Sequence, residues 1–135
     1  MKADVTKYNY LKTGITANVE GLDDVKEFSI LEKAMTDVGM EQMEKANVFR
    51  CTAAVLHIGN LVFAEGAQGD SHLSTDPAVQ QTAKGLAAML GLQMDALVGA
   101  LCSTVITVGG TESKKSKTVK EANFGTINII STLVL

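Results

Sequence analysis

The chain has 135 residues, 46% of them apolar, which is enough for one domain with a hydrophobic core. Its 12 basic and 15 acidic residues give a net charge of −3, so nothing in the overall charge favours binding to nucleic acid or to an anionic membrane. No apolar run is long enough to cross a bilayer, and the polar start Met1-Lys2-Ala3-Asp4 predicts no signal peptide. Cys51 and Cys102 lack the spacing of a zinc or redox motif, so we expect small core residues in a cytoplasmic protein.

Hydrophobic spacing and helix-end signals predict most of the secondary structure in the first hundred residues. The predicted helices run from Asp24 to Gly39, from Glu41 to Ile58, from Pro77 to Leu90 and from Met94 to Leu101. From Cys51 to Ile58 almost every residue is apolar, which predicts that this part of the second helix is buried nearly all round, with Leu56 in the core.

The remaining segments predict short strands and loops. Leu61 to Phe63 and Thr104 to Val108 are expected to be strands, and the polar stretch from Glu65 to Asp76 is expected to be a surface loop. Residues 111–117 are predicted to form a hairpin tip, and the β-branched residues of 124–135 favour a strand. The predicted fold class is mainly α with a small β-hairpin.

Few residues suggest a catalytic or ligand-binding role. His57 lies in the apolar helix and is expected to be a core or boundary histidine, while His72 is expected to be solvated. Gly109, Lys115 and Ser116 match part of the phosphate-binding pattern G-x-x-x-x-G-K-[ST], but Lys114 replaces the second glycine, whose backbone freedom a phosphate cradle needs. The sequence therefore predicts no catalytic, metal or cofactor-binding residue in this chain.

The segment from Gly109 to Glu121 contains four lysines and two glutamates. A solvated hairpin tip and a patch for an acidic partner are both consistent with this composition, and composition alone favours the solvated tip.

One long string resembles a known family. Residues 53–63 read Ala-Ala-Val-Leu-His-Ile-Gly-Asn-Leu-Val-Phe, similar to the "AAxLHLGNxxF" run of the myosin head. Tyr10-Leu11, Val19-Glu20-Gly21, Ala34-Met35 and Leu90-Gly91-Leu92 continue the resemblance in the family's order. It covers about residues 8–122 and leaves 123–135 as a divergent tail, where the family has a long helix with an Arg-Asp pair.

The resemblance implies a partial myosin motor domain from the actin-binding half of the head. That head is related to P-loop ATPases and holds Mg-ATP when complete. The phosphate loop G-E-S-G-A-G-K-T and the two switch motifs N-x-x-S-S-R-F-G-K and D-I-x-G-F-E are absent from this chain, so we expect its nucleotide core to be absent and the chain alone to be inactive.

Two segments, Glu65 to Asp76 and Thr104 to Glu121, correspond to loops that face actin in the family. Their charged residues are the candidate site. These candidates are Lys114, Lys115, Lys117, Glu112, Glu65 and Asp70. The resemblance shifts the preferred interpretation of the lysines toward an actin contact, because actin's exposed face is acidic.

Three hypotheses follow. The first is a fragment of a myosin head whose partners are the actin filament and the remainder of the head, in the cytoplasm and associated with the cytoskeleton. The second is a free-standing actin-binding module, and the third is a degenerate phosphate-binding protein built around Gly109 to Ser116.

Overall fold

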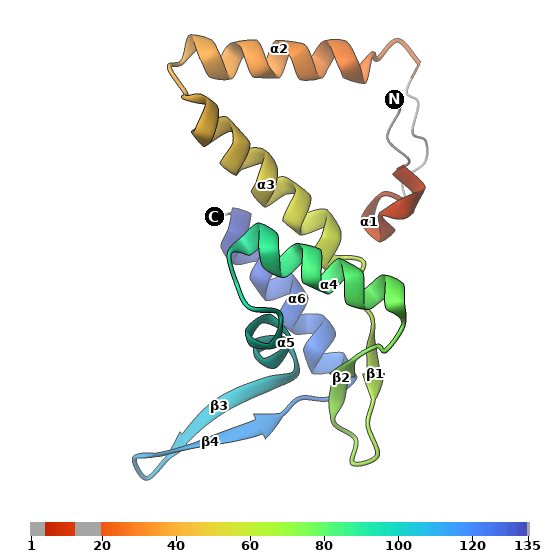
Figure 1. Ribbon diagram of the computed structural model, residues 1–135, viewed down its shortest axis with the longest axis vertical. Helices are drawn as coiled ribbons and strands as arrows, with labels where there is room; N and C mark the ends of the chain where they lie inside the picture. Colours follow the sequence, from red (N-terminus) through yellow and green to blue (C-terminus); the bar gives the residue numbers. More distant parts are fainter. Residues whose placement is uncertain (1–4, 13–19, 135) are drawn as a thin grey trace.

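The computed structural model describes residues 5–12 and 20–134. Met1 to Asp4, Val19 and Leu135, which the sequence analysis used, lie outside the described residues. Most of the described chain is helical, with two separate antiparallel strand pairs at one end of the molecule (Figure 1). The predicted class, mainly α, is confirmed, although the structure has two β-hairpins and the prediction had one.

The elements follow one another in a simple order. They are η1 (Val5–Lys7), α1 (Asn9–Lys12), α2 (Asp24–Asp37), α3 (Gln42–Ile58), β1 (Phe63–Glu65), β2 (Ser71–Leu73), α4 (Pro77–Leu90), α5 (Met94–Cys102), β3 (Ser103–Val108), β4 (Thr111–Ser116) and α6 (Val119–Val134). The four predicted helices are confirmed to within a residue or two.

Side-chain caps fix two of these helix starts. The Asp23 carboxylate accepts hydrogen bonds from the N–H groups of Val25 and Lys26 at 3.1 and 3.3 Å, and the Asp76 carboxylate accepts one from Ala78 at 2.7 Å, with Pro77 in the first position of α4. These bonds satisfy N–H groups that have no partner inside the helix. The acidic residues therefore mark helix starts, as the sequence indicates.

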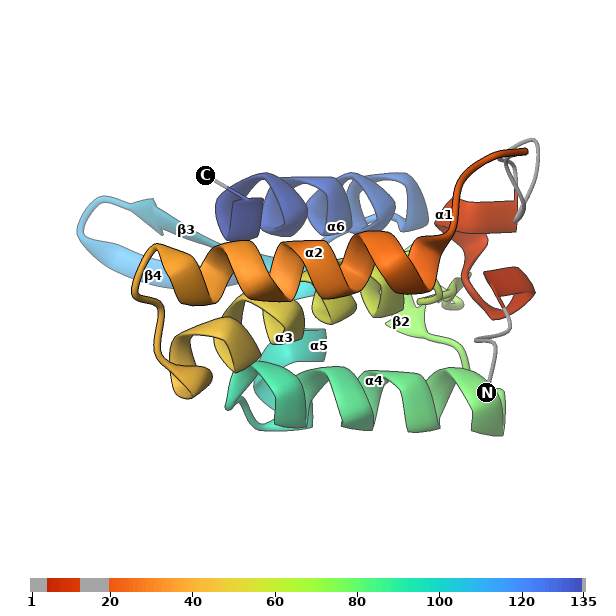
Figure 2. The ribbon, with the colours of Figure 1, turned by 90° about the horizontal axis from the view of Figure 1, so that it is seen from above.

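The hydrophobic core lies where the lower half of α3 packs between α4 and α6, with α5 and the β1–β2 hairpin beneath (Figures 1 and 2). Its largest fully buried side chains are Ile58, Leu86 and Leu101. Four helices and one hairpin thus share one small core.

Two expectations about α3 are wrong. Cys51 is exposed, and Leu56 is half-buried, whereas Ala54 and Ile58 are buried at 0% and 1% exposure. The apolar run covers more of the helix surface than the neighbouring helices bury, so part of it stays in contact with water.

The tail prediction is also wrong: the last segment is the helix α6. Thr118 and Glu121 form a reciprocal cap, in which the Glu121 carboxylate accepts from the Thr118 N–H and hydroxyl at 2.8 and 2.9 Å, and the Thr118 hydroxyl accepts from the Glu121 N–H at 3.3 Å. Ala122 and Thr126 then face the core with helical spacing. Strand propensity was overridden by a strong helix start and by burial of one helix face.

The Gly59-Asn60 pair fastens the N-terminal segment to the end of α3. The Asn60 side chain donates to the Lys7 carbonyl at 2.7 Å and accepts from the Asn9 N–H at 2.8 Å. The Asn9 amide donates to the Gly59 carbonyl at 2.9 Å, and a Cβ at Gly59 would run into the Tyr10 ring. The histidine before them, His57, is half-buried and meets the Tyr8 ring edge-on at 5.5 Å, in the boundary setting expected from the sequence.

The upper part of the molecule is an arm, which we define as α2 together with residues 42–50 of α3. In Figure 2, α2 lies above α3, and Figure 1 shows it apart from α4, α5 and α6. No residue of α2 is buried. Across the described residues, no single helix is both long and apolar enough to cross a membrane.

Leu86→Ala should lower the free energy of unfolding by about 2–5 kcal/mol, because it removes fully buried methyl groups and leaves a cavity. Leu56→Ala should cost less, since this side chain is only partly buried. Urea denaturation of the 135-residue chain measures both, and equal losses would contradict the core described above.

Candidate functional site

The β3–β4 hairpin carries most of the candidate residues. Its strands pair from Ser103 opposite Ser116 to Val108 opposite Thr111, and the turn is Gly109-Gly110, with φ values of 59° and 84°. Two positive φ values in succession are typical of the tight turn that connects twisted strands, and glycine adopts them without strain. The hairpin tip is therefore this glycine pair, and residues 111–116, predicted to be the tip, form a strand instead.

This geometry separates the lysines. Residues directly opposite each other in a hairpin share a face, and successive residues alternate between faces. Lys114 therefore lies on one face with Val105, and Lys115 lies on the other face with Thr104. Both lysines are exposed, but they cannot form the single patch that the sequence predicts.

Lys114 and Lys117 both lie at the C-terminal end of α5. The Lys117 ammonium donates to the Ala100 carbonyl at 2.8 Å, and the Lys114 ammonium would lie 3.8 Å from a Cβ at Gly99. Cations are favourable there because the last helical carbonyls point outward without partners. Part of the lysine cluster thus stabilises the fold.

Lys117 also joins the two hairpins through its backbone. Its N–H donates to the Cys102 carbonyl and its carbonyl accepts from the Ser71 N–H, both at 2.8 Å. Ser71 lies in β2, so both hairpins are fixed relative to each other and to α5 at this residue. Burial raises the pKa of the nearby Cys102 thiol, although the Ser71 hydroxyl and Lys117 offset part of this effect.

The second hairpin replaces the loop predicted from Glu65 to Asp76. Glu65 ends β1 opposite Ser71, and the tip closes through a 2.7 Å bond from the Gly66 N–H to the Asp70 carbonyl. A Cβ at Gly66 would meet the Asp70 carboxylate, so a larger residue here would require that side chain to move. Glu65 is exposed and Asp70 is half-buried, which leaves Glu65 as the more accessible carboxylate of the two. His72 is exposed, as expected, but lies in β2.

Glu112 lies near the glycine turn, opposite Thr107 and on the same face as Lys114. The structure therefore brings Glu112 and Lys114 together, places Lys115 on the other face, and uses Lys117 as an anchor. Glu65 and Asp70 lie on the separate β1–β2 hairpin.

The partial phosphate pattern has no cradle geometry. A phosphate-binding loop connects a strand to a helix, whose N-terminal N–H groups face the anion. Here Gly109 lies in a hairpin turn, and Lys115 and Ser116 lie on a strand. Among the described residues, no three His, Cys, Asp or Glu side chains are grouped so that they could hold a metal ion.

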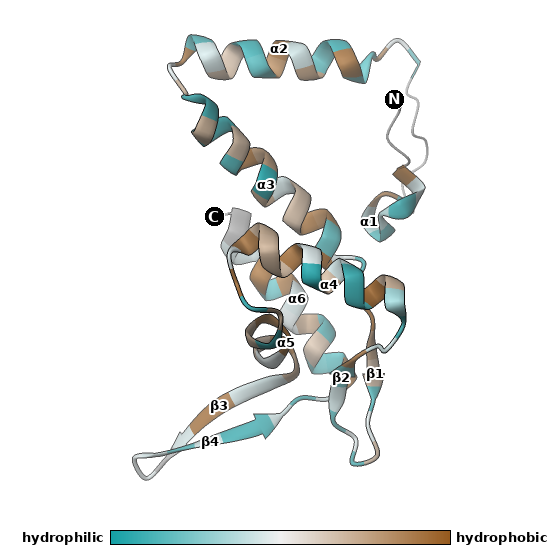
Figure 3. Ribbon diagram, in the orientation of Figure 1, coloured by the Kyte–Doolittle hydropathy of each residue, from teal (hydrophilic) through white to brown (hydrophobic). Residues whose placement is uncertain are grey.

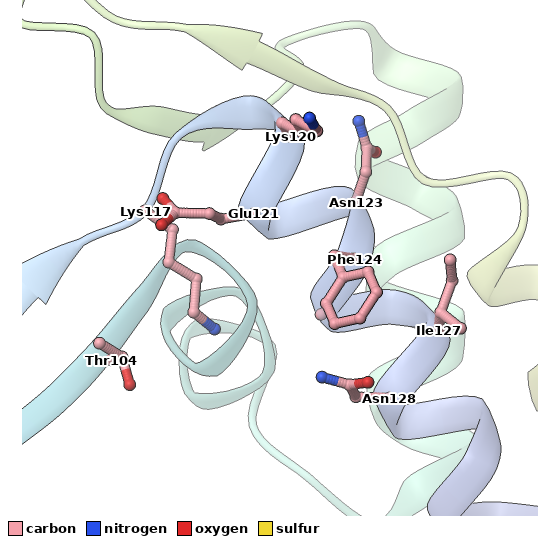
Figure 4. A pocket seen from close by; sticks show the side chains of 9 residues that line it. Thr104, Lys117, Lys120, Glu121, Asn123, Phe124, Ile127 and Asn128 are labelled. Carbon is pink, nitrogen blue, oxygen red and sulfur yellow. The ribbon is translucent and has the colours of Figure 1, made fainter.

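The sequence did not predict the apolar hollow beside the base of the β3–β4 hairpin. It measures about 560 Å³, with Thr104 and Lys117 on one side and Phe124 and Asn128 of α6 on the other (Figure 4). Phe124 is 62% exposed. The sequence predicts a strand-like tail for this residue, but the Thr-x-x-Glu signal at Thr118 indicates a helix start and would have placed it in a helix.

The architecture defines a mostly helical domain with two hairpins at one end, and comparisons with known proteins identify its family. The sequence profile of the myosin head (motor domain) family matches residues 1–132. The chain is 34% identical to Myosin-14 of Arabidopsis thaliana over 108 residues, 33% to Myosin heavy chain IB of Acanthamoeba castellanii over 111, and 38% to Myosin IE heavy chain of Dictyostelium discoideum over 104. The chain therefore belongs to the myosin head (motor domain) family.

These alignments cover 76 to 82% of this chain but 7 to 10% of those three relatives. The chain thus corresponds to a small part of a myosin heavy chain.

Glu121 gives the site a measurable pH response. Hydrogen bonds from the Thr118 N–H and hydroxyl lower the pKa of the Glu121 carboxyl, and Lys115 and Lys117 lower it further. Because the folded pKa is the lower one, the stability from this group is fully present above the ordinary value of 4.5 and is lost as pH falls through the folded value. Glu121→Gln keeps an acceptor oxygen but no charge, so its urea midpoint should fall less than the parent's as the pH is lowered below 4.5. If the urea midpoints of the parent and of Glu121→Gln fall equally as the pH is lowered, the lowered pKa of Glu121 would be contradicted.

Proposed function

We propose that this chain is part of an actin-based, ATP-driven motor head, that its β3–β4 hairpin contacts the actin filament, and that it holds no complete ATP site. The observation that carries the proposal is the exposure of the hairpin: β4 is exposed along its whole length, and Val105 and Ile106 of β3 are 61% and 39% exposed. An isolated two-stranded hairpin is at best marginally stable in water, so one held out from the core in this way is suited to meeting a partner.

The charge of the hairpin supports an acidic partner. Lys114 and Lys115 are exposed on opposite faces, so a filament approaching from either face meets one cation beside an apolar or β-branched residue. Complementary charge mainly speeds and orients docking, and apolar contacts supply more of the affinity. We propose Lys114, Lys115 and Glu112 as the primary contact with actin and the Glu65–Asp70 tip as a secondary contact. Lys117 contributes by holding the β3–β4 hairpin in position.

The remainder of the motor head is the second proposed partner. Members of this family are cytoskeleton-associated motors, which supports a cytoplasmic location within a myosin complex. Because the phosphate loop and both switches are absent from the 135 residues, binding of Mg-ATP requires chain from outside this segment.

A chimera tests the actin contact. The matching segment in the head of Dictyostelium Myosin IE heavy chain would be replaced by this chain, which is 38% identical to it over 104 residues. Lys114→Glu with Lys115→Glu should raise the actin concentration for half-maximal ATPase activation by roughly two- to thirtyfold, because exposed ion pairs contribute about 0.2–1 kcal/mol each and two are lost. ATPase turnover without actin should stay unchanged, and higher salt should reduce the difference.

The matched control is Lys26→Glu with Lys84→Glu, which makes the same change in net charge at exposed positions on α2 and α4. Equal effects of the two double variants would refute the hairpin contact. Tight co-sedimentation of the isolated 135-residue chain with actin filaments would instead favour a free-standing actin-binding module.

Mg-ATP should leave the melting temperature of the isolated chain unchanged, because a ligand stabilises a protein only by binding its folded state. Differential scanning fluorimetry with and without Mg-ATP measures this. A rise that disappears in Lys115→Ala would favour the phosphate-binding alternative.

A further inference from the structure

The two strands of the β3–β4 hairpin differ in charge. β3 has six residues, from Ser103 to Val108, and none of them is charged, a proline or a glycine. β4 contains Glu112, Lys114 and Lys115, and Figure 3 shows it as the more hydrophilic strand. Charged side chains, lysine above all, hinder the pairing of an edge strand with another chain. The outer edge of β4 is therefore protected against such pairing, and the outer edge of β3 is not.

The outer edge of β3 presents backbone groups without a strand partner. In an antiparallel pair, every second residue directs its N–H and C=O at the partner strand, and the residues between them direct theirs away from it. The bond from the Lys117 N–H to the Cys102 carbonyl continues the register of the hairpin, so this carbonyl belongs to the inward set. Val105 and Thr107 lie an odd number of residues further along, so their N–H and C=O groups point away from β4. In the described part of the chain, no hydrogen bond joins these groups to another element.

This edge is accessible near the turn. Figures 1 and 2 show the turn end of the hairpin projecting beyond the helices. The side chains of Val105 and Ile106 are 61% and 39% exposed, and Thr107 is exposed. A sheet of two strands is marginally stable in water, and three or more strands with an apolar face are needed for independent stability. Another strand along β3 would supply partners for its outward backbone groups and cover part of its apolar side chains.

We propose that two copies of this chain associate through the outer edges of β3, antiparallel to each other, in one sheet with the order β4, β3, β3, β4. The symmetry axis passes between the two copies of Ile106, and Val105 of each copy lies opposite Thr107 of the other. In this register Val105 and Thr107 exchange both of their outward hydrogen bonds. The two Ile106 side chains meet on one face, at the closer spacing of a pair without hydrogen bonds. The inference does not rest on the proposed function, because neither actin nor the rest of the head takes part.

Charge selects this arrangement over the alternatives. Pairing through β4 would bring Lys114 and Lys115 of the two copies together, and like charges opposite each other are destabilising. With both β3 strands in the centre, the two β4 strands are about 14 Å apart, because neighbouring strands are spaced by about 4.8 Å. An acidic partner would be attracted to these lysines, not to the uncharged β3. A contact made by a strand of six residues is smaller than the about 800 Å² per partner of a stable complex, so we expect reversible association at high concentration.

Sedimentation velocity of the isolated chain over a wide range of concentrations tests the pairing. The average mass should rise from 14.3 kDa toward twice this value as the concentration increases. Ile106→Lys should raise the dissociation constant at least about tenfold, because it places like charges opposite each other at the contact. The matched control, Ser113→Lys, adds the same charge to the same face, opposite Ile106 on β4, and should leave the association unchanged. A chain that stays monomeric throughout, or equal effects of the two variants, would overturn the inference.

Cysteine crosslinking tests the register, in a Cys51→Ser background that removes the exposed thiol. Ile106→Cys should give a disulfide-linked dimer under mild oxidation with copper phenanthroline, because facing Cα atoms in a pair without hydrogen bonds are about 4.5 Å apart, within reach of a disulfide. Thr104→Cys lies on the same face, but this register places it opposite Val108 of the other copy, so it should not crosslink. If both cysteine variants crosslink equally fast, or neither does while the mass still doubles, the copies do not meet through β3 in this register and the inference is wrong.

Discussion

Three hydrogen bonds at Lys117, each 2.8 Å long, hold the hairpin end of this molecule together. The Lys117 N–H and ammonium bind carbonyls at the end of α5, and its own carbonyl receives the Ser71 N–H of the other hairpin. Because the next residue, Thr118, caps α6, the same short connection also sets where the last helix starts. Both hairpins, α5 and α6 therefore depend on one residue that the sequence suggests only as a surface charge.

The rest of the architecture divides into a packed half and an open half. Around Ile58, Leu86 and Leu101 the helices bury one another. At the two ends, the β3–β4 hairpin and the arm have exposed surfaces of different chemistry. The hairpin exposes both charged and apolar side chains, which suits a reversible contact with a partner, whereas the exposed Phe28 and Leu31 of the arm are apolar. A small part of a large motor head would be expected to show both kinds of surface.

The family's most distinctive string has a structural explanation. Ala54 and Ile58 face the core, Gly59 leaves space for the Tyr10 ring, and Asn60 binds the backbone of the preceding N-terminal segment. These residues therefore fix α1 against the end of α3. Nothing in this geometry assigns chemistry to His57, whose contact with Tyr8 is a packing contact.

The sequence by itself determined the elements whose signals are local. Asp23, Asp76 with Pro77, and the apolar spacing between the caps defined the first helices, because capping and periodicity act within a few residues. The family resemblance, carried by residues 53–63, was equally readable. The helix α6 could have been predicted from the capping residues Thr118 and Glu121, but the β-branched composition of the segment favoured a strand.

Only the tertiary structure decided which apolar residues are buried and which charges can act together. Leu56 and Cys51 lie in an apolar run, yet the neighbouring helices bury Ala54 and Ile58 fully and leave Cys51 exposed. Lys114 and Lys115 are neighbours in sequence but lie on opposite faces, since their register depends on a turn placed at Gly109-Gly110. Burial and long-range hydrogen bonds such as those of Lys117 involve segments far apart in the chain, and no local pattern encodes them.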